Sequence, residues 1–315
     1  MIQVFLALWV VSAALIIIEK KIVRIIIYLG IFSMFASVCF LLLSAPDVAM
    51  AEAVISVFST VFFIICFEKY YGLCAKIPEG DIIGKIRGTG KIKNAVKKAA
   101  PPLIFTAALF ALFICFIPDT APVKDLPKQY LGLFKTDIGG ENAVTAVYLG
   151  YRVYDTLFEA LMLLVSVVAV AHLSWYNETS ASSGRQSDIN RSEIAVCTIR
   201  VIAPLILLFS VYLIANGHLS PGGGFQGGVM AAAFFICRYL IHNIYDVTVK
   251  KIITAEKLLF VCIALFAALF IFMGLSGFFS LDKSVYLIAM NLLIGLKVAC
   301  GFMVIFYRFI VFEKK

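Results

Sequence analysis

Charged side chains are scarce in this chain of 315 residues. They make up 15% of it, whereas hydrophobic residues make up 62% and the mean hydropathy is +1.00. Soluble domains carry about a quarter charged residues, so the composition excludes an ordinary soluble domain. Lysine and arginine outnumber aspartate and glutamate by 27 to 19, but no basic stripe interleaved with aromatic residues accompanies the excess. The sequence therefore predicts a membrane protein that binds no nucleic acid.

Clustered metal ligands are also lacking. The eight cysteines are scattered, and no two of them form a Cys-x-x-Cys pair. Iron–sulfur clusters and zinc sites need clustered thiolates. No nucleotide-binding glycine loop follows a strand pattern. We expect no metal, no cofactor and no catalytic site in this chain.

Long apolar runs are abundant instead. About 20 apolar residues cross roughly 30 Å of hydrocarbon as a helix. Nine windows approach or exceed that length: 2–18, 22–43, 48–67, 101–118, 153–173, 194–215, 224–243, 257–276 and 284–309. The first is followed by charged residues and lacks a small-residue cleavage site, which indicates a retained span. The expected fold is an all-α integral membrane protein with about nine transmembrane helices.

Basic residues gather in alternate connections between these windows. With the N-terminus outside, most of the 27 lysines and arginines fall on the inner side. Cytoplasmic connections of membrane proteins show this excess. We expect the N-terminus outside and the C-terminus inside, in a multi-pass protein of the prokaryotic inner (cell) membrane.

Two polar breaks divide the chain. Residues 70–100 are basic and dotted with glycine, and residues 174–192 are rich in serine. The breaks predict a three-helix segment (1–95), a two-helix segment (96–188) and a four-helix domain (189–315). No repeat of fixed period is visible, which counts against an inverted-repeat transporter.

Ionisable residues inside spans are costly and usually mark an ion path or a buried pair. In "SAPDVAMAEAVISVF", Asp47 opens the third predicted helix and Glu52 lies five residues further on. Aspartate suits an N-cap, so Asp47 is either a cap or part of an ion path. Glu52 is too deep for a cap and must be protonated, paired or in contact with water. Both are candidates for an ion or proton path.

A second set lies in "YRVYDTLFEALMLL". Arg152, Asp155 and Glu159 are spaced i, i+3 and i+7, which places them on one helix face. They form either a local Arg–Asp pair at the outer interface or a polar face directed into the bundle. For Glu159 we favour the second alternative.

Lys297, in "NLLIGLKVACGF", falls near the middle of the last window. A lysine at this depth is either structural, held by a buried carboxylate, or part of a proton relay, because its pKa shifts readily on burial. Arg200, nearer a membrane surface, is expected to snorkel.

The connection "NGHLSPGGGFQGGVM" is unusually rich in glycine. Ser220 and Pro221 predict the N-cap and first turn of the next helix, and the glycines allow close helix approach. His218 is either a proton acceptor at the mouth or an interface histidine bonded to a loop carbonyl. The candidate packing motif consists of Gly217, Pro221, Gly222, Gly223, Gly224, Gly227 and Gly228.

These stretches resemble a known family. "NGHLSPGGGFQGG" resembles the glycine-rich signature of the B subunit of Mrp-type multisubunit Na⁺/H⁺ antiporters, which also has four helices. "APDVAMAEA" resembles a motif in the C-terminal extension of the large A subunit and in the D-type subunit of membrane-bound hydrogenases. "GENAVTAVYLGYRVYDTLFEA" resembles the adjacent E-type piece.

The resemblance implies a fused D–E–B membrane subunit without a catalytic site of its own, which contributes to Na⁺/H⁺ translocation in a membrane module. Its implied partners are other antiporter subunits, a hydrogenase or other redox module, Na⁺, H⁺ and membrane lipid. Five candidates fall on motif positions, namely Asp47, Glu52, Arg152, Asp155 and Glu159, and Lys297 is not among them. The alternatives are a self-sufficient secondary ion transporter and a purely architectural spacer.

Overall fold

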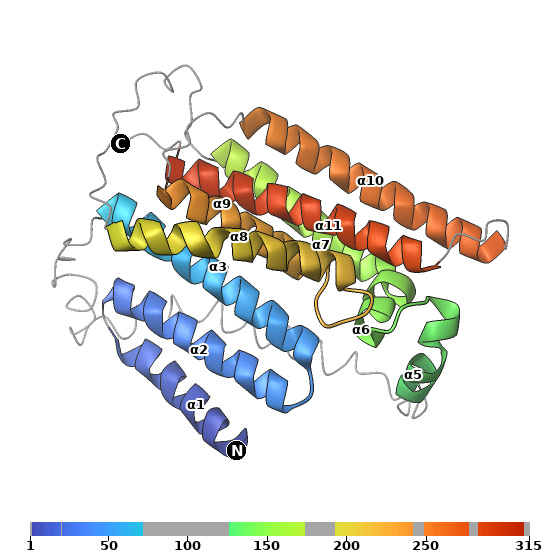
Figure 1. Ribbon diagram of the computed structural model, residues 1–315, viewed down its shortest axis with the longest axis horizontal. Helices are drawn as coiled ribbons and strands as arrows, with labels where there is room; N and C mark the ends of the chain where they lie inside the picture. Colours follow the sequence, from blue (N-terminus) through green and yellow to red (C-terminus); the bar gives the residue numbers. More distant parts are fainter. Residues whose placement is uncertain are drawn as a thin grey trace, which may run out of the picture. The chain divides into compact units, whose positions relative to one another are not determined.

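The computed structural model describes residues 2–19, 21–71, 126–173, 193–241, 249–276 and 283–311, and within these ranges it consists of helices joined by turns and loops, with no strand. The elements are α1 (Ile2–Ile18), α2 (Ile22–Leu42), α3 (Pro46–Tyr71), α5 (Leu126–Asp137), α6 (Ala143–Ala146), the π-helix η2 (Val147–Tyr151), α7 (Val153–Leu173), α8 (Glu193–Asn216), α9 (Gly224–Ile241), α10 (Val249–Ser276), α11 (Lys283–Phe306) and the π-helix η4 (Tyr307–Val311) (Figure 1). Met1–Tyr70 and Tyr130–Lys315 form one compact unit, and a second unit comprises Tyr71–Gln129. Of the second unit, only Tyr71 and residues 126–129 are described.

Six of the described helices are long and apolar enough to cross a membrane: α2, α3, α7, α8, α10 and α11. α1 is a shorter apolar helix of 17 residues, and α9 has 18 residues. The window 101–118, the serine-rich break and nearly all of the basic break lie outside the described residues. The all-helical membrane architecture is thus confirmed, and the nine-span count, the orientation and the three-part division stay predictions.

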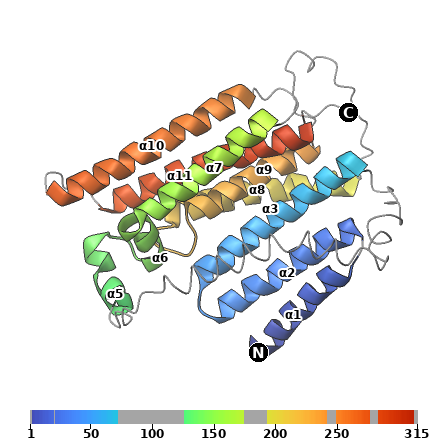
Figure 2. The ribbon, with the colours of Figure 1, turned by 180° about the vertical axis from the view of Figure 1, so that it is seen from behind.

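Helix α11 occupies the centre of the larger unit. It contacts α7, α8, α9 and α10, and both views show it between these neighbours (Figures 1 and 2). Half of its membrane span is buried, against 11–22% for the other five candidate spans. Two of its buried residues, Asn291 and Lys297, are polar. The core of the bundle is therefore also the place where polar groups are withdrawn from lipid.

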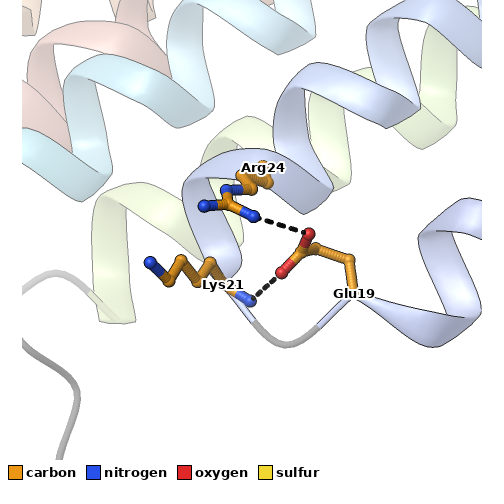
Figure 3. Close-up of polar contacts among 3 residues, drawn as sticks. All are labelled: Glu19, Lys21 and Arg24. Atoms are coloured by element: carbon orange, nitrogen blue, oxygen red, sulfur yellow. Dashed lines mark hydrogen bonds and ion pairs between the residues drawn. The ribbon is translucent and has the colours of Figure 1, made fainter.

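The N-terminal helices attach to this core through α3. α1 packs against α2, and the turn between them is held by Glu19, which accepts hydrogen bonds from the backbone N–H of Lys21 at 3.0 Å and from Nη1 of Arg24 at 3.4 Å (Figure 3). The Ser37 hydroxyl of α2 donates to the carbonyl of Ala49 in α3 at 2.7 Å. The rings of Phe58 in α3 and Phe302 in α11 meet edge to face with centroids 4.8 Å apart.

Helix α5 lies in a stretch that the sequence predicts as an outer connection, so the prediction missed it. Its C-terminal end is tied to the bundle by two side chains. Lys283 at the start of α11 donates through Nζ to the carbonyl of Thr136 at 2.6 Å, and the Tyr151 hydroxyl donates to the Asp137 carboxylate at 2.8 Å.

The glycine-rich connection does not begin a helix at Ser220 and Pro221, and that prediction is wrong. α9 begins three residues after Pro221, at Gly224. Gly222 adopts a φ of 135°, a backbone conformation that side chains disfavour, so the chain turns before the helix starts. The loop carbonyls and N–H groups are thereby free to bind other segments.

The flat glycine face of α9 is confirmed. A Cβ added at Gly228 would lie 2.6 Å from the carbonyl oxygen of Gly295 and 2.7 Å from Cβ of Val298, both in α11. On the side of α8, the buried Ser210 hydroxyl donates to the carbonyl of Gly227 at 2.8 Å. Small residues of this kind let membrane helices approach backbone to backbone.

We predict that Gly228→Ala destabilises the full chain by about 1–3 kcal/mol, because the new methyl group meets backbone and Cβ atoms that have no room to move. The matched control is Gly132→Ala in α5, where an added Cβ has nothing within 4 Å. The control is expected to be neutral or slightly stabilising. The stability of both variants is measured by thermal unfolding in detergent micelles. Equal unfolding midpoints for the two variants would contradict the close packing of α9 against α11.

Candidate functional site

A buried carboxylate joins three stretches of the chain at the beginning of α3. Oδ1 of Asp47 accepts hydrogen bonds from Nδ2 of Asn142 at 3.0 Å and from the backbone N–H of Gly222 at 3.1 Å. The N-cap prediction for Asp47 is wrong, because α3 begins at Pro46 and the carboxylate binds other segments. Asp47 therefore links α3 to the loop before α6 and to the glycine-rich loop before α9.

Asn142 is the second member of this junction, and the sequence analysis missed it. It caps α6, where Oδ1 accepts from the N–H groups of Val144 and Thr145 at 2.9 and 3.4 Å. Its Nδ2 also reaches the carbonyls of Gly217 at 3.3 Å and Ser220 at 3.0 Å. An asparagine directly before an apolar run is a signal for a helix start. That signal is present in "GENAVTAV".

His218 supports the same junction with its backbone. Its carbonyl accepts from the N–H groups of Glu141 at 2.9 Å and Asn142 at 3.0 Å. The buried imidazole lies with Nδ1 3.1 Å from the carbonyl oxygen of Ala215. The ring thus contacts a backbone carbonyl, as in the second alternative, but this carbonyl belongs to the last turn of α8 and not to a loop.

From the junction, polar groups continue toward α11. The Thr145 hydroxyl donates to the carbonyl of Gly217 at 2.6 Å. The Tyr148 hydroxyl lies 3.2 Å from Oδ1 of Asn291, which also accepts from the N–H of Gly224 at 3.0 Å. Burial raises the pKa of Tyr148 to about 12, so this phenol stays protonated and donates. Within the described part of the chain, Nδ2 of the buried Asn291 has no hydrogen-bond partner.

An ion pair lies in the core between α10 and α11. Nζ of Lys297 is 2.8 Å from Oε1 of Glu256, and both side chains are 0% exposed. The structure thus confirms that a buried carboxylate holds Lys297, and the relay role stays a prediction. The second oxygen, Oε2 of Glu256, has no hydrogen-bond partner among the described residues. It can accept a proton or a water molecule.

Glu256 was not identified from the sequence, because the predicted window began one residue later. Because of the lysines at 250, 251 and 257, the stretch before the predicted window was interpreted as an inner connection. α10 in fact begins at Val249. Val249, Glu256 and Ile263 are all buried and recur every seven residues, which places them on one helix face. This seven-residue spacing is the feature of the sequence that could have identified Glu256 as a buried residue.

Glu159 and Lys297 line the same small cavity. A cavity of about 10 Å³ is lined by both residues, together with the Thr156 side chain and apolar neighbours. The Thr156 hydroxyl itself donates to the carbonyl of Tyr148 at 2.6 Å. Glu159 is exposed rather than buried in the bundle, so it lies at the rim of this cavity. Lys297 is thus bonded to one carboxylate, that of Glu256, and shares a cavity with a second, that of Glu159.

Among the residues that the structure describes, no hydrogen bond or ion pair joins the remaining predicted site residues to the junction or to the buried ion pair. Arg152 and Asp155 form a local ion pair through Nε and Oδ2, and both side chains are exposed. Glu52 is half-buried on α3, and no hydrogen bond or ion pair joins it to another predicted site residue in the described part of the chain. Among the described residues, no group of three or more metal-binding side chains occurs.

Two family models match the sequence. Residues 194–312 match a domain related to the MnhB subunit of Na⁺/H⁺ antiporters. Residues 7–71 match MbhD, the D-type subunit of MBH. These two segments carry the glycine-rich loop, the Lys297–Glu256 pair and Asp47.

Curated relatives point to the same kind of protein. The mnhA2 antiporter subunit of Staphylococcus haemolyticus is 25% identical over 178 residues, which cover 56% of this chain and 20% of the relative. The mnhA2 protein of Staphylococcus saprophyticus is 24% identical over 181 residues, covering 58% of this chain and 21% of the relative. The chain thus spans about a fifth of the length of these relatives.

Solved structures share the fold. A chain of the Mrp complex from Dietzia sp. superimposes with a TM-score of 0.66 at 20% identity, covering 98% of this chain and 34% of that one. A chain of the membrane-bound sulfane sulfur reductase, an archaeal respiratory membrane complex, gives a TM-score of 0.52 at 26% identity. That likeness covers 71% of this chain and 100% of the other. Residues 7–71 and 194–312 thus match the MbhD and MnhB-related family models, and the chain is a multi-pass prokaryotic membrane protein that is similar to antiporter subunits of the Mrp/MBH type.

Proposed function

We propose that this chain is a non-catalytic membrane subunit of a multisubunit Mrp-type cation/proton antiporter complex, in which it contributes to Na⁺/H⁺ translocation. The two family matches and the fold of the Dietzia Mrp chain support membership in such a complex. The observation that carries the role in translocation is the fully buried pair of Lys297 and Glu256.

A buried ion pair is an expensive way to hold two helices together. Replacing such a pair by apolar residues of similar volume is often neutral or stabilising, so packing alone does not call for one. Lysine exchanges its proton when its surroundings change. A proton moving from Nζ of Lys297 to Glu256 leaves two neutral groups, which the apolar core tolerates better than separated charges.

We infer that protons reach the pair through the polar groups nearest to it. Glu159 lines the same small cavity as Lys297 and is itself exposed. On the side of the junction, Asp47, Asn142, Thr145 and Tyr148 lead toward Asn291 in α11. We assign proton transfer to Glu159, Lys297 and Glu256, and we keep Asp47, Glu52, Arg152, Asp155 and His218 as candidates for the approach to them.

The proposed partners are the other antiporter subunits and, in complexes that couple ion movement to electron transfer, a hydrogenase or other redox module. The match to MbhD and the likeness to a chain of the sulfane sulfur reductase support the redox-coupled form. Co-purification from native membranes through a C-terminal tag tests the partners. A chain that purifies alone under mild detergents, and exchanges ions alone in liposomes, would make it a self-sufficient transporter.

We predict that the double variant Glu256→Gln Lys297→Gln assembles into the complex but loses cation-dependent proton transport by at least about ten-fold, because a neutral amide pair keeps a hydrogen bond and transfers no proton. The single variant Lys297→Gln leaves Glu256 buried without its counter-charge and is expected to cost about 3–5 kcal/mol of stability. Transport is measured in proteoliposomes that contain the assembled complex.

The matched control is Glu193→Gln Lys257→Gln, which makes the same chemical changes at two exposed positions. It is expected to transport like the parent. Full transport by the Glu256→Gln Lys297→Gln variant would leave the pair with an architectural role only, and the chain would then be a spacer.

A further prediction separates a purely structural role of Asp47 in the junction from a role of its charge in the ion path. Asp47→Asn keeps an oxygen that accepts from Asn142 and Gly222, whereas Asp47→Ala leaves both donors unpaired. We expect Asp47→Ala to cost about 1–3 kcal/mol for each unpaired donor, and Asp47→Asn to retain the stability and most of the transport. Thermal unfolding measures the stability of the Asp47→Asn and Asp47→Ala variants, and proteoliposomes measure their transport. If Asp47→Asn were as stable as the parent but unable to transport, the charge of Asp47 would itself belong to the ion path.

A further inference from the structure

The small cavity beside Lys297 lies between α7, α9 and α11, and side chains from all three helices line it. Its volume is about 10 Å³. A cavity needs about 10–15 Å³ of space open to a water-sized sphere to hold one water molecule. The three polar residues that line it are Thr156, Glu159 and Lys297. The cavity is therefore large enough for one water molecule and too small for two.

The ammonium group of Lys297 can donate more hydrogen bonds than the one that Glu256 accepts. An ammonium group carries three N–H donors. Oε1 of Glu256 lies 2.8 Å from Nζ, and the side chain of Lys297 is 0% exposed. Buried polar groups are costly to leave without hydrogen bonds. A water molecule in the cavity that Lys297 lines would accept a second hydrogen bond from this ammonium group.

Thr156 and Glu159 can accept the hydrogen bonds that such a water molecule donates. The Thr156 hydroxyl donates to the carbonyl of Tyr148 at 2.6 Å, which orients it and leaves lone pairs of its oxygen to accept. The carboxylate oxygens of Glu159 accept as well. Buried waters make about three hydrogen bonds, whereas cavities that stay dry are lined by apolar groups. The three polar residues of this cavity match the number of bonds that a buried water makes.

We propose that the cavity binds one ordered water molecule, which accepts a hydrogen bond from Nζ of Lys297 and donates to the Glu159 carboxylate and to the Thr156 hydroxyl oxygen. The proposal rests on the proposed function, because it names the group that joins Glu159 to the buried pair of Lys297 and Glu256. Thr156 is a positioning residue in this arrangement: it holds the water molecule in place and exchanges no proton.

The water molecule lets a proton pass between Lys297 and Glu159 without direct contact of the two side chains. Nζ gives a proton to the water oxygen while the water gives one of its own protons to a carboxylate oxygen of Glu159. The water is regenerated, and an ammonium and a carboxylate become a neutral amine and a carboxylic acid. Groups joined by one water molecule are within the reach that proton transfer requires. The buried Lys297 thereby exchanges protons with the exposed Glu159.

Electron cryomicroscopy of the assembled complex tests the site directly, at a resolution that shows ordered water elsewhere in the bundle. We expect one density peak at hydrogen-bond distance, about 2.7–3.2 Å, from Nζ of Lys297, a carboxylate oxygen of Glu159 and the Thr156 hydroxyl. A cavity without a peak would overturn the proposal. A peak closer to its oxygen neighbours than a hydrogen bond allows would also overturn it, because it would indicate a bound cation.

A cavity-filling variant tests the role of the water molecule in proton transport. Ala160 is buried and lines the cavity, so Ala160→Val places methyl groups in the space of the water. We expect this variant to lose the density peak and at least about ten-fold of the cation-dependent proton transport in proteoliposomes, because Glu159 and Lys297 are then no longer joined. The matched control is Ala169→Val, the same change on the same helix at a position that does not line the cavity. The control is expected to keep the peak and the transport.

A second pair of variants covers the case in which Ala160→Val does not assemble. Thr156→Ser keeps the hydroxyl and is expected to keep the peak and the transport, whereas Thr156→Val removes the hydroxyl and is expected to lose both. An Ala160→Val or Thr156→Val complex that lacks the peak and transports like the parent would overturn the role of the water in proton transfer. None of these outcomes contradicts the proposed function, which fails only if Glu256→Gln Lys297→Gln transports fully.

Discussion

One carboxylate oxygen, Oδ1 of Asp47, holds together parts of the chain that are far apart in sequence. It binds Asn142, 95 residues away, and Gly222, 175 residues away. Asn142 donates through its side chain and Gly222 through its backbone N–H, and both residues lie in irregular segments, whose N–H and C=O groups have no helical partner and are costly to leave unpaired within a membrane protein. The junction satisfies these groups and at the same time fixes where α3, α6 and α9 begin. The packing of α9 against α11 follows from that placement.

The bundle separates polar groups by their role. Near the starts of α3, α6 and α9 they form a connected set in which most atoms have partners. Deeper in the bundle, Lys297 and Glu256 form a pair in which one carboxylate oxygen is unsatisfied in the described structure. Partly satisfied buried groups of this kind are rare in structural cores and usually indicate function.

Sequence reasoning succeeded where a long-range pattern was present and failed where the answer depended on tertiary contacts. Apolar runs located α2, α3, α7, α8 and α11, because span length is set by membrane thickness. The spacing of Gly224, Gly227 and Gly228 predicted a flat helix face. The partner of Lys297 was missed because Glu256 sits among lysines, and only the helix face that it occupies distinguishes it from a solvated residue. The part that Asp47 plays in the junction was missed because a cap and a junction use the same residue type, and contacts 95 and 175 residues away leave no local trace.

The covalent continuity of the chain has a consequence for its assembly. Stretches that contribute to the Asp47 junction are tethered to one another, so their association is an intramolecular event with an effective concentration on the order of millimolar. Under that condition a few hydrogen bonds are enough to keep the junction formed. Separate polypeptides would need a larger interface to be associated for the same fraction of the time. Tethering also fixes the stoichiometry, because every copy of α3 arrives with one copy of the glycine-rich loop. The junction can therefore remain small and polar at a place where an independent subunit would require an extended apolar surface.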